Sequence, residues 1–147
     1  PMRAPWQTVR DALVGLSNPE KSEGDAANHR FQGGARVYPG HTGSPLDLPA
    51  KTLKAGDHGV PGGENMMVRD DGSVRYFTVR ESARIQTFPD GYAFHGSWSE
   101  AMRQLGNAVP VTLGRVVAAS VAEHLLNDDI RRVTTGQLAL ETAMAHA

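Results

Sequence analysis

The side chains in this sequence that are best suited to chemistry are hydrogen-bond donors and cations, which favour binding over bond-making. Arg80 and Arg84 are spaced one helical turn apart, so both guanidinium groups can project from one helix face. A guanidinium is a planar fork of donors that can tie carboxylates and loop carbonyls together. The 147 residues include no cysteine, so the chain offers no thiolate nucleophile, disulfide or Cys-type metal site. An ordinary helix with surface arginines would show the same spacing.

A second constellation is the pentapeptide from Gly106 to Pro110, which reads Gly-Asn-Ala-Val-Pro. Glycine lets a backbone approach a ligand closely, and the Asn107 amide offers both a donor and an acceptor. The same residues also suit a plain turn between two helices. Alone, the pentapeptide is therefore a weak indication of a ligand site.

Polar side chains that can reach nucleic-acid bases or phosphates are spread through the middle of the chain. The candidates are Arg36, His41, Lys51, Thr52, Lys54, His58 and Arg69. Each of them alone fits a solvated surface role equally well. Lys51 and Lys54 suit phosphate better than base.

The charge balance indicates that any binding of nucleic acid by this chain is shared with a partner. The formal net charge is −1, whereas an autonomous nucleic-acid binder usually carries a basic surplus. From His29 to Arg84, eight basic residues face six acidic ones, which is a surplus of only two.

The elements that position these residues differ along the chain. Nine of the 16 glycines lie between Gly33 and Gly72, interleaved with prolines, which predicts turns and close backbone approach instead of long helices. Short strands are expected at 35–38, 50–54, 65–69 and 74–79, with a hairpin turn at Asp71-Gly72. Near the start, Thr8 is predicted to cap a short helix, with Asp11 completing the cap.

Beyond residue 80 the pattern becomes helical. A short helix is expected at 80–86, and Ser99 is expected to cap a helix over 100–105 that Gly106 ends in a left-handed conformation. Pro110 suits the first turn of the next helix. That helix has an apolar face from Leu113 to Leu125 and is predicted to end near Asn127, with 131–147 either helical or a frayed tail.

Composition excludes some classes of protein. A mean hydropathy of −0.39 and the lack of a long apolar run predict no membrane span, and no secretory signal is visible at the N-terminal end. A cytoplasmic setting fits these features.

The stretch from Thr78, Thr-Val-Arg-Glu-Ser-Ala-Arg-Ile-Gln-Thr-Phe-Pro-Asp-Gly-Tyr, followed at Gln104 by Gln-Leu-Gly-Asn-Ala-Val-Pro, resembles the last two motifs of the DNA (cytosine-5)-methyltransferases. The Thr52-Leu53 pair resembles a hallmark of the recognition domain in the bacterial branch, which adds Leu53 to the DNA-contact candidates. The residues after Thr8 resemble the segment that follows the eighth motif. The resemblance runs from about Thr8 to Leu126.

The resemblance implies a role for each motif. Arg80, Arg84, Pro89, Asp90 and Gly106 would organise the recognition domain, and Asn107 and Ala108 would line the S-adenosylmethionine pocket. Members with serine in place of Ala108 have a hydroxyl contact that this chain lacks. No catalytic residue is assigned, because the family attacks cytosine with a Pro-Cys nucleophile.

Two further patterns are not assigned to chemistry. Glu64-Asn65-Met66 is similar to the family's Glu-Asn-Val but falls on the wrong side of the recognition domain. His41, Asp57 and His58 have a spacing that fits no standard metal-ligand set, so no metal is expected.

The resulting expectation is an α+β fragment: a small, irregular β-rich recognition subdomain followed by helices that, in the family, pack on a Rossmann-like methyltransferase domain. Its segments are an entry (1–28), the recognition subdomain (29–79), the C-terminal motifs and helices (80–127) and a tail (128–147). The expected partners are double-stranded DNA and an N-terminal catalytic half that shares S-adenosylmethionine. The apolar helix face predicts self-association of the isolated chain. A stand-alone DNA-binding module, an inactive relic and an RNA cytosine methyltransferase fragment remain alternatives.

Overall fold

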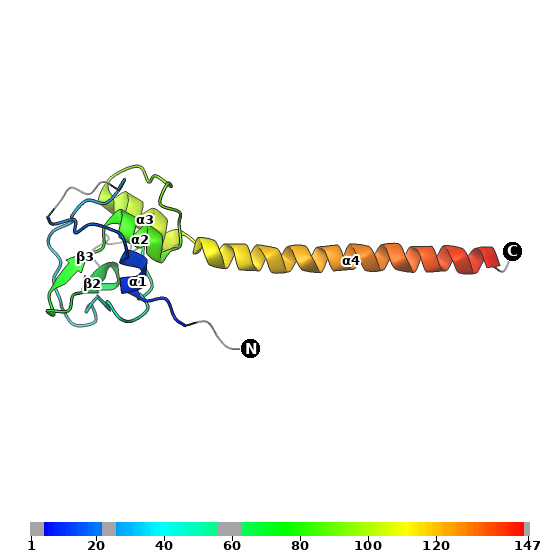
Figure 1. Cartoon of the computed structure of the whole chain (residues 1–147), viewed down its shortest axis with the longest axis horizontal. Coiled ribbons are helices and arrows are strands. Elements are labelled where there is room, and N and C mark those ends of the chain that lie inside the picture. Colours follow the sequence, from blue (N-terminus) through cyan, green and yellow to red (C-terminus); the bar gives the residue numbers. More distant parts are fainter. Residues whose placement is uncertain (1–4, 22–25, 56–62, 146–147) are drawn as a thin grey trace. The chain divides into compact units, whose positions relative to one another are not determined.

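A computed structural model of the chain describes residues 5–21, 26–55 and 63–145, and of 129–134, 136–143 and 145 it describes only the backbone (Figure 1). The chain divides into two compact units, residues 1–110 and residues 111–147. The first contains every strand and three of the α-helices that the structure describes, and the second is one long helix. The expected α+β class is confirmed for this chain.

The first unit holds a three-stranded sheet in the order β1-β2-β3. Strands β2 (Met66–Val68) and β3 (Val74–Tyr76) are antiparallel, with Met67 opposite Arg75. The predicted hairpin turn between them is confirmed: Gly72 has a φ of 80°, and the Gly72 N–H donates to the Arg69 carbonyl at 2.9 Å. Only glycine adopts this backbone without strain.

Strand β1 (Ser44–Pro45) is a two-residue edge strand that pairs with β2 in parallel. The sequence did not indicate it, because Pro45 lacks the N–H of a regular strand and is tolerated only at an edge. The expected strands at 35–38 and 50–54 are wrong. Gly34 and Gly40 adopt positive φ and turn the chain before and after 35–38, where Tyr38 forms a single bridge with His41.

Helix α1 (Val9–Leu13) has the predicted capping box, in which Thr8 and Asp11 exchange hydrogen bonds. Helix α2 (Val79–Ile85) is capped in the same way by Thr78 and Glu81. Helix α3 (Trp98–Asn107) is capped by Ser97 with Glu100, so the expected cap at Ser99 is wrong.

Two hydrophobic clusters hold the first unit together. Helices α2 and α3 bury one cluster between them, which is made of Val79, Ala83, Phe94, Ala101, Met102 and Leu105. The other joins α1 to the sheet through Val9, Leu53, Met67 and Phe77. Phe77 lies two residues before α2, and Ile85 of α2 also packs against the second cluster, so both clusters contact that helix.

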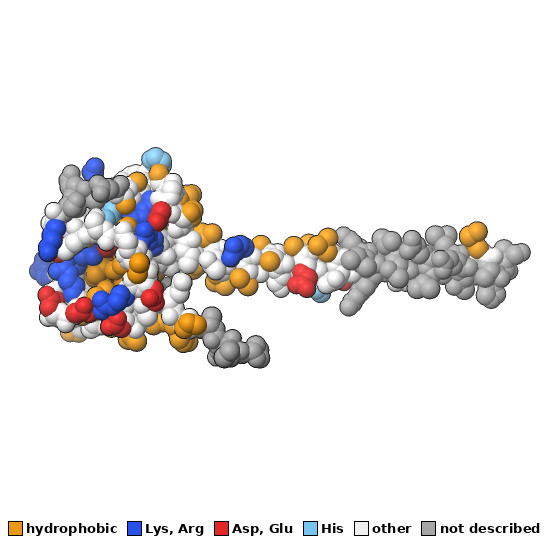
Figure 2. All heavy atoms as spheres, in the orientation of Figure 1, with side chains coloured by type: hydrophobic (Ala, Val, Ile, Leu, Met, Phe, Trp, Pro, Cys, Tyr) orange, Lys and Arg blue, Asp and Glu red, His pale blue; other side chains and the backbone are white. Residues whose placement is uncertain are grey.

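The second unit is α4 (Val111–Ala145). It begins one residue after Pro110 and continues past Asn127 to Ala145, so the expected end near Asn127 is wrong. The predicted apolar side chains are exposed along it, with Leu113, Val116, Val117, Val121 and Leu125 each more than half accessible. They appear as orange side chains along the helix in Figure 2.

The expectation that the chain lacks a long apolar run is wrong. Helical residues 98–128 include an 18-residue window with a mean hydropathy of 1.3, which suffices in length and composition for a membrane span. That stretch also contains the break between α3 and α4 at 108–110, and apolar helices of proteins outside membranes meet the same criterion.

Candidate nucleic-acid interface

Arg80 is a buried cross-link between three parts of the first unit. Its side chain is fully buried, and its guanidinium donates to the carbonyls of Ala27 (3.0 Å), Pro89 (3.3 Å) and Tyr92 (2.7 Å). Three separate directions of donation require the planar fork of arginine. Arg80 therefore holds residues 89–92, which follow α2, against the backbone at Ala27.

Arg84, one helical turn after Arg80, contacts the same loop of residues 89–92. It makes a two-pronged contact with Asp90, with both N–O distances at 2.7 Å, and also donates to the Val14 carbonyl at 2.6 Å. The guanidinium holds the pKa of the Asp90 carboxyl below its usual range. Together Arg80 and Arg84 tie residues 89–92 to α2 and to the end of α1.

The lowered pKa of Asp90 predicts a pH-dependent contribution to stability. A carboxyl with a depressed folded-state pKa stabilises the fold above its unfolded pKa of about 3.9 and loses that stabilisation as the pH falls through the folded value. Because Asp90 is largely exposed, Asp90→Asn is expected to cost less than about 1 kcal/mol at neutral pH. Urea titrations at several pH values should show the gap between the two proteins closing in acid. A gap independent of pH would rule out the ionised pair as its source.

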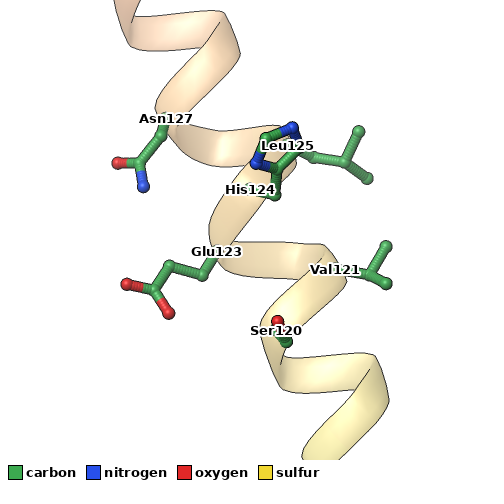
Figure 3. A pocket seen from close by; sticks show the side chains of 6 residues that line it. All are labelled: Ser120, Val121, Glu123, His124, Leu125 and Asn127. Atoms are coloured by element: carbon green, nitrogen blue, oxygen red, sulfur yellow. The ribbon is translucent and has the colours of Figure 1, made fainter.

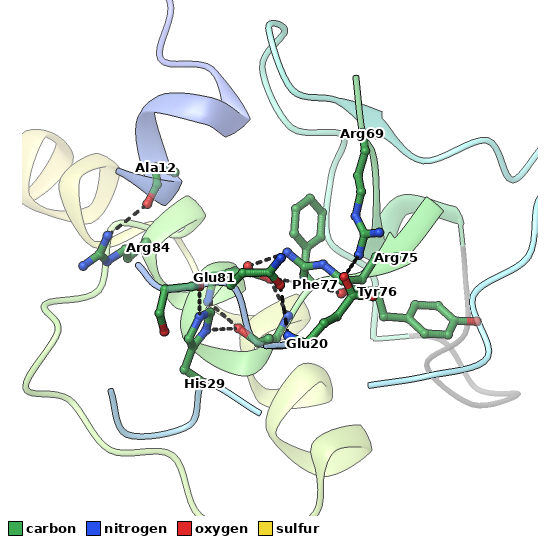
Figure 4. Close-up of polar contacts among 12 residues, drawn as sticks. Ala12, Glu20, His29, Arg69, Arg75, Tyr76, Phe77, Glu81 and Arg84 are labelled. Atoms are coloured by element: carbon green, nitrogen blue, oxygen red, sulfur yellow. Dashed lines mark hydrogen bonds and ion pairs between the residues drawn. The ribbon is translucent and has the colours of Figure 1, made fainter. Parts of the chain in front are cut away.

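A second buried network links β3 to α2, and no pattern in the sequence predicted this pairing (Figure 4). Arg75 on β3 makes a two-pronged ion pair with Glu81 on α2, at 2.8 and 2.7 Å, and both side chains are almost fully buried. One Glu81 oxygen also accepts the Thr78 N–H at 2.8 Å, so the carboxylate caps the helix at the same time. Only the Thr-x-x-Glu pattern at 78–81 could have indicated the cap.

His29 completes this network from the other side. Its imidazole is buried between the Thr78 hydroxyl (2.9 Å) and the Ser17 carbonyl (2.8 Å). The carbonyl can only accept, so the ring nitrogen facing it carries the proton. This residue anchors the point where the chain enters the glycine-rich segment.

Gly106 allows α3 to touch the chain that follows Leu53. The expected left-handed helix end is wrong, since Gly106 lies inside α3 and lacks a positive φ. A Cβ on it would lie 2.5 Å from the Ala55 nitrogen and 2.7 Å from the Lys54 carbonyl carbon. The glycine is thus required for close backbone approach.

Gly106→Ala is therefore expected to destabilise the chain by about 1–3 kcal/mol, because backbone must move to admit the methyl group. This overrides the gain of about 1 kcal/mol that alanine brings to a helix interior. The matched control is Gly114→Ala in α4, where a Cβ meets nothing within 4 Å. Urea denaturation of both variants checks the prediction, and a Gly106→Ala variant as stable as the wild type would contradict it.

Asn107 and Ala108, the candidate cofactor contacts, lie at the end of α3. Asn107 is the last helical residue and is exposed, so its amide is accessible. The Ala108 N–H donates to the Leu105 carbonyl at 3.2 Å, which leaves the Ala108 carbonyl as its remaining backbone group. The donor and acceptor of the Asn107 amide fit a polar cofactor group.

The DNA-contact candidates have different surroundings. Leu53 is 3% exposed and packs in the core cluster with Val9 and Phe77, so its side chain is not presented at the surface. His58 lies outside the described residues. Thr52 and Arg36 are exposed.

The other candidates have partners within the chain. Lys51 donates to the Thr42 hydroxyl at 2.8 Å, and Lys54 pairs with Glu64 at 2.9 Å. Arg69 pairs with Glu20 at 2.6 Å (Figure 4). His41 stacks on Tyr38 with ring centroids 4.3 Å apart and lies 3.7 Å from Glu64. Figure 2 shows acidic and basic side chains interspersed on the visible face of the first unit.

The Glu64-Asn65 pair has a structural role. Asn65 is buried and exchanges hydrogen bonds with the Lys54 backbone, at 3.3 and 3.4 Å. The hydrogen bond from Lys54 lowers the pKa of Glu64. No cluster of three metal-ligating side chains occurs among the described residues.

Two hollows differ in what surrounds them. The hollow on α4 between Ser120 and Asn127 is lined by side chains of that single helix, so it is a solvated helix face (Figure 3). A groove of about 590 Å³ in the first unit is lined instead by three segments: Gln32 to Tyr38, Tyr76 and Trp98. Of the candidates whose positions the structure describes, Arg36 alone lines it.

Comparison with known proteins identifies the family. The family model of the C-5 cytosine-specific DNA methylases matches residues 17–123. The type II methyltransferase M.AplI of Arthrospira platensis is 40% identical over 89 residues, which are 58% of this chain and 25% of that protein. M.Eco47II of Escherichia coli is 57% identical over 54 residues, 37% of this chain and 13% of that protein. The rice DNA (cytosine-5)-methyltransferase CMT2 is 50% identical over 48 residues, 33% of this chain and 4% of that protein. The chain thus spans a quarter or less of the length of these relatives, and with its match over most of its length it belongs to the C-5 cytosine-specific DNA methylase family.

Proposed function

We propose that this chain is the target-recognition and C-terminal part of a DNA cytosine-5 methyltransferase of the restriction-modification type. The observation that carries the proposal is a family match over residues 17–123 in a sequence without cysteine. Methyl transfer to cytosine C5 requires a nucleophile on C6 of the flipped base, and the thiolate of cysteine fills that role in the family. The nucleophile is therefore supplied by a catalytic half outside these 147 residues.

The residues of the chain divide into scaffold and contacts. Arg80 and the Arg75–Glu81 pair hold the first unit in one arrangement through buried contacts, and Arg84 adds a more exposed contact with Asp90. The exposed Asn107 amide forms part of the cofactor pocket, where S-adenosylmethionine supplies the methyl group. The glycine-rich segment before β2 contacts double-stranded DNA.

The apolar surface of α4 supports the need for a second half. Leu125 and Leu126 are about 60% exposed, as is Val116, which lies between two and three turns earlier on the helix. Exposed aliphatic side chains at this density favour burial against another surface. The catalytic half is the proposed cover.

The experiment compares three proteins: this chain alone, this chain fused to the N-terminal part of M.AplI, and M.AplI itself. Transfer of labelled methyl groups to duplex DNA is measured, followed by sequencing of the methylated sites. We expect no transfer by the chain alone, and transfer by the fusion at sites other than those of M.AplI. Robust methylation by the single chain, or a fusion with the M.AplI sites, would contradict the proposal.

A competition assay separates the alternatives. Structured RNA and duplex DNA are added to the active fusion in equal amounts. Stronger inhibition by duplex DNA is expected, whereas preferential inhibition by RNA would favour an RNA methyltransferase fragment. Tight site-specific binding by the chain alone would favour a stand-alone module.

A further inference from the structure

The cations of the first unit are not equally available to a ligand. Lys54 and Arg69 are paired with carboxylates, and Lys51 is held by the Thr42 hydroxyl. A paired cation must give up its partner before it binds a base or a phosphate, and that exchange lowers the net gain. These residues are therefore poor anchors for DNA.

Arg36 differs from them. It is exposed and makes no hydrogen bond or ion pair with any residue in the described parts of the chain. It stands at the groove lined by Gly33, Gly34, Tyr38, Tyr76 and Trp98. Its five donors are thus available beside a concave surface.

The aromatic walls of this groove are held in place. The Trp98 indole donates to the Phe77 carbonyl at 3.1 Å, and its ring lies 5.2 Å from that of Tyr76. Tyr38 is supported from behind by the His41 ring and is 44% exposed. Rings with fixed orientation offer contact area with little loss of conformational freedom on binding.

We infer that this groove receives the edge of a DNA base pair and that Arg36 is the base-reading residue, contacting guanine through its O6 and N7 atoms. The inference rests on the proposed function and goes beyond it by naming the contact. A bidentate guanidinium matches the two acceptors of guanine, and arginine–guanine is the commonest specific contact in the major groove. Tyr38, at the rim, contacts the adjoining base or sugar.

A base contact fits the surroundings better than a phosphate contact. Surfaces that track phosphates carry several available cations, because each neutralised phosphate adds to affinity. Among the described residues, Arg36 is the one cation that lines this groove, where it stands among aromatic side chains, and the formal net charge of the chain is −1. Arg30, which is also exposed, lines the neighbouring hollow instead.

The test exploits the difference between arginine and lysine. The full 147-residue chain and its Arg36→Lys and Arg36→Ala variants are incubated at low salt with a randomised duplex pool, and the bound DNA is sequenced. Lysine keeps the charge but loses the two-pronged fork. We expect the wild type to enrich guanine at one position, and both variants to lose that enrichment by about tenfold, with Arg36→Lys retaining most of the total binding.

Other outcomes separate the explanations. If Arg36→Lys keeps the guanine preference and Arg36→Ala merely weakens binding to all sequences, the residue contacts phosphate and the inference is overturned while the proposed function stands. If the wild type retains no duplex DNA above background, the same selection is made with the fusion to the N-terminal part of M.AplI, and a fusion that also retains none would overturn both the proposed function and the inference. Arg103→Ala, an exposed arginine on α3 outside the groove, is the matched control and should select the wild-type sequences. Equal melting temperatures for all four proteins would show that the fold is intact.

Discussion

Arg80→Ala is expected to lower the free energy of unfolding by about 4 kcal/mol or more, because it leaves three carbonyl groups without their donor in the interior. The carbonyls belong to Ala27, Pro89 and Tyr92. Arg80→Lys should recover little of the loss, since one ammonium group cannot reach all three. Urea denaturation followed by the fluorescence of Trp98 measures the effect.

The control for Arg80 is again Arg103→Ala, which removes an arginine from the exposed face of α3 and should change stability by less than about 0.5 kcal/mol. An Arg80→Lys variant as stable as the wild type would show that the charge alone, and not the fork of donors, holds the loop.

Breaking the buried pair between β3 and α2 is expected to have an effect of similar size. Glu81→Leu leaves the Arg75 guanidinium buried without its carboxylate and removes the α2 cap, which should cost about 3–5 kcal/mol. Replacing both partners with apolar residues, in Arg75→Met with Glu81→Leu, removes the stranded charge. The double variant should therefore be more stable than Glu81→Leu alone.

A double-mutant cycle in urea quantifies the coupling between the two side chains. Thr78→Ala leaves the ion pair in place and measures the loss of the Thr78 cap together with the loss of its hydrogen bond to His29. If the two single costs simply add in the double variant, the pair is not coupled and the prediction is wrong.

Local sequence patterns predicted the elements that depend on neighbouring residues. The cap at Thr8, the hairpin at Asp71-Gly72 and helix α2 each follow from short-range chemistry. The start of α3 was missed by two residues although Ser97-x-x-Glu100 is itself a capping box.

Long-range contacts were beyond the reach of those patterns. His29 meets Thr78 across 49 residues, and Arg75 meets Glu81 only because a strand and a helix are placed side by side. Leu53 was assigned to DNA by its position in a motif, yet its side chain fills the core. Similarly, the spacing of the cations did not predict which of them form ion pairs. Lys54 and Arg69 each pair with a carboxylate, whereas Arg36 has no such partner among the described residues.

The segment from residue 30 to residue 43 is fastened at its two ends and carries few buried side chains between them. At one end, Asn28 exchanges two hydrogen bonds of 2.9 Å with the Phe94 backbone, next to the buried His29. At the other, Gly43 packs against Val68 and β1 joins the sheet. Gln32 to Tyr38, which line the groove together with Tyr76 and Trp98, lie in this segment. The sequence of the segment can be exchanged for another of similar length while both anchors, and the free energy they contribute, stay unchanged. Under the proposed function, a new target sequence would then require replacement of one short stretch, without redesign of the protein that carries it.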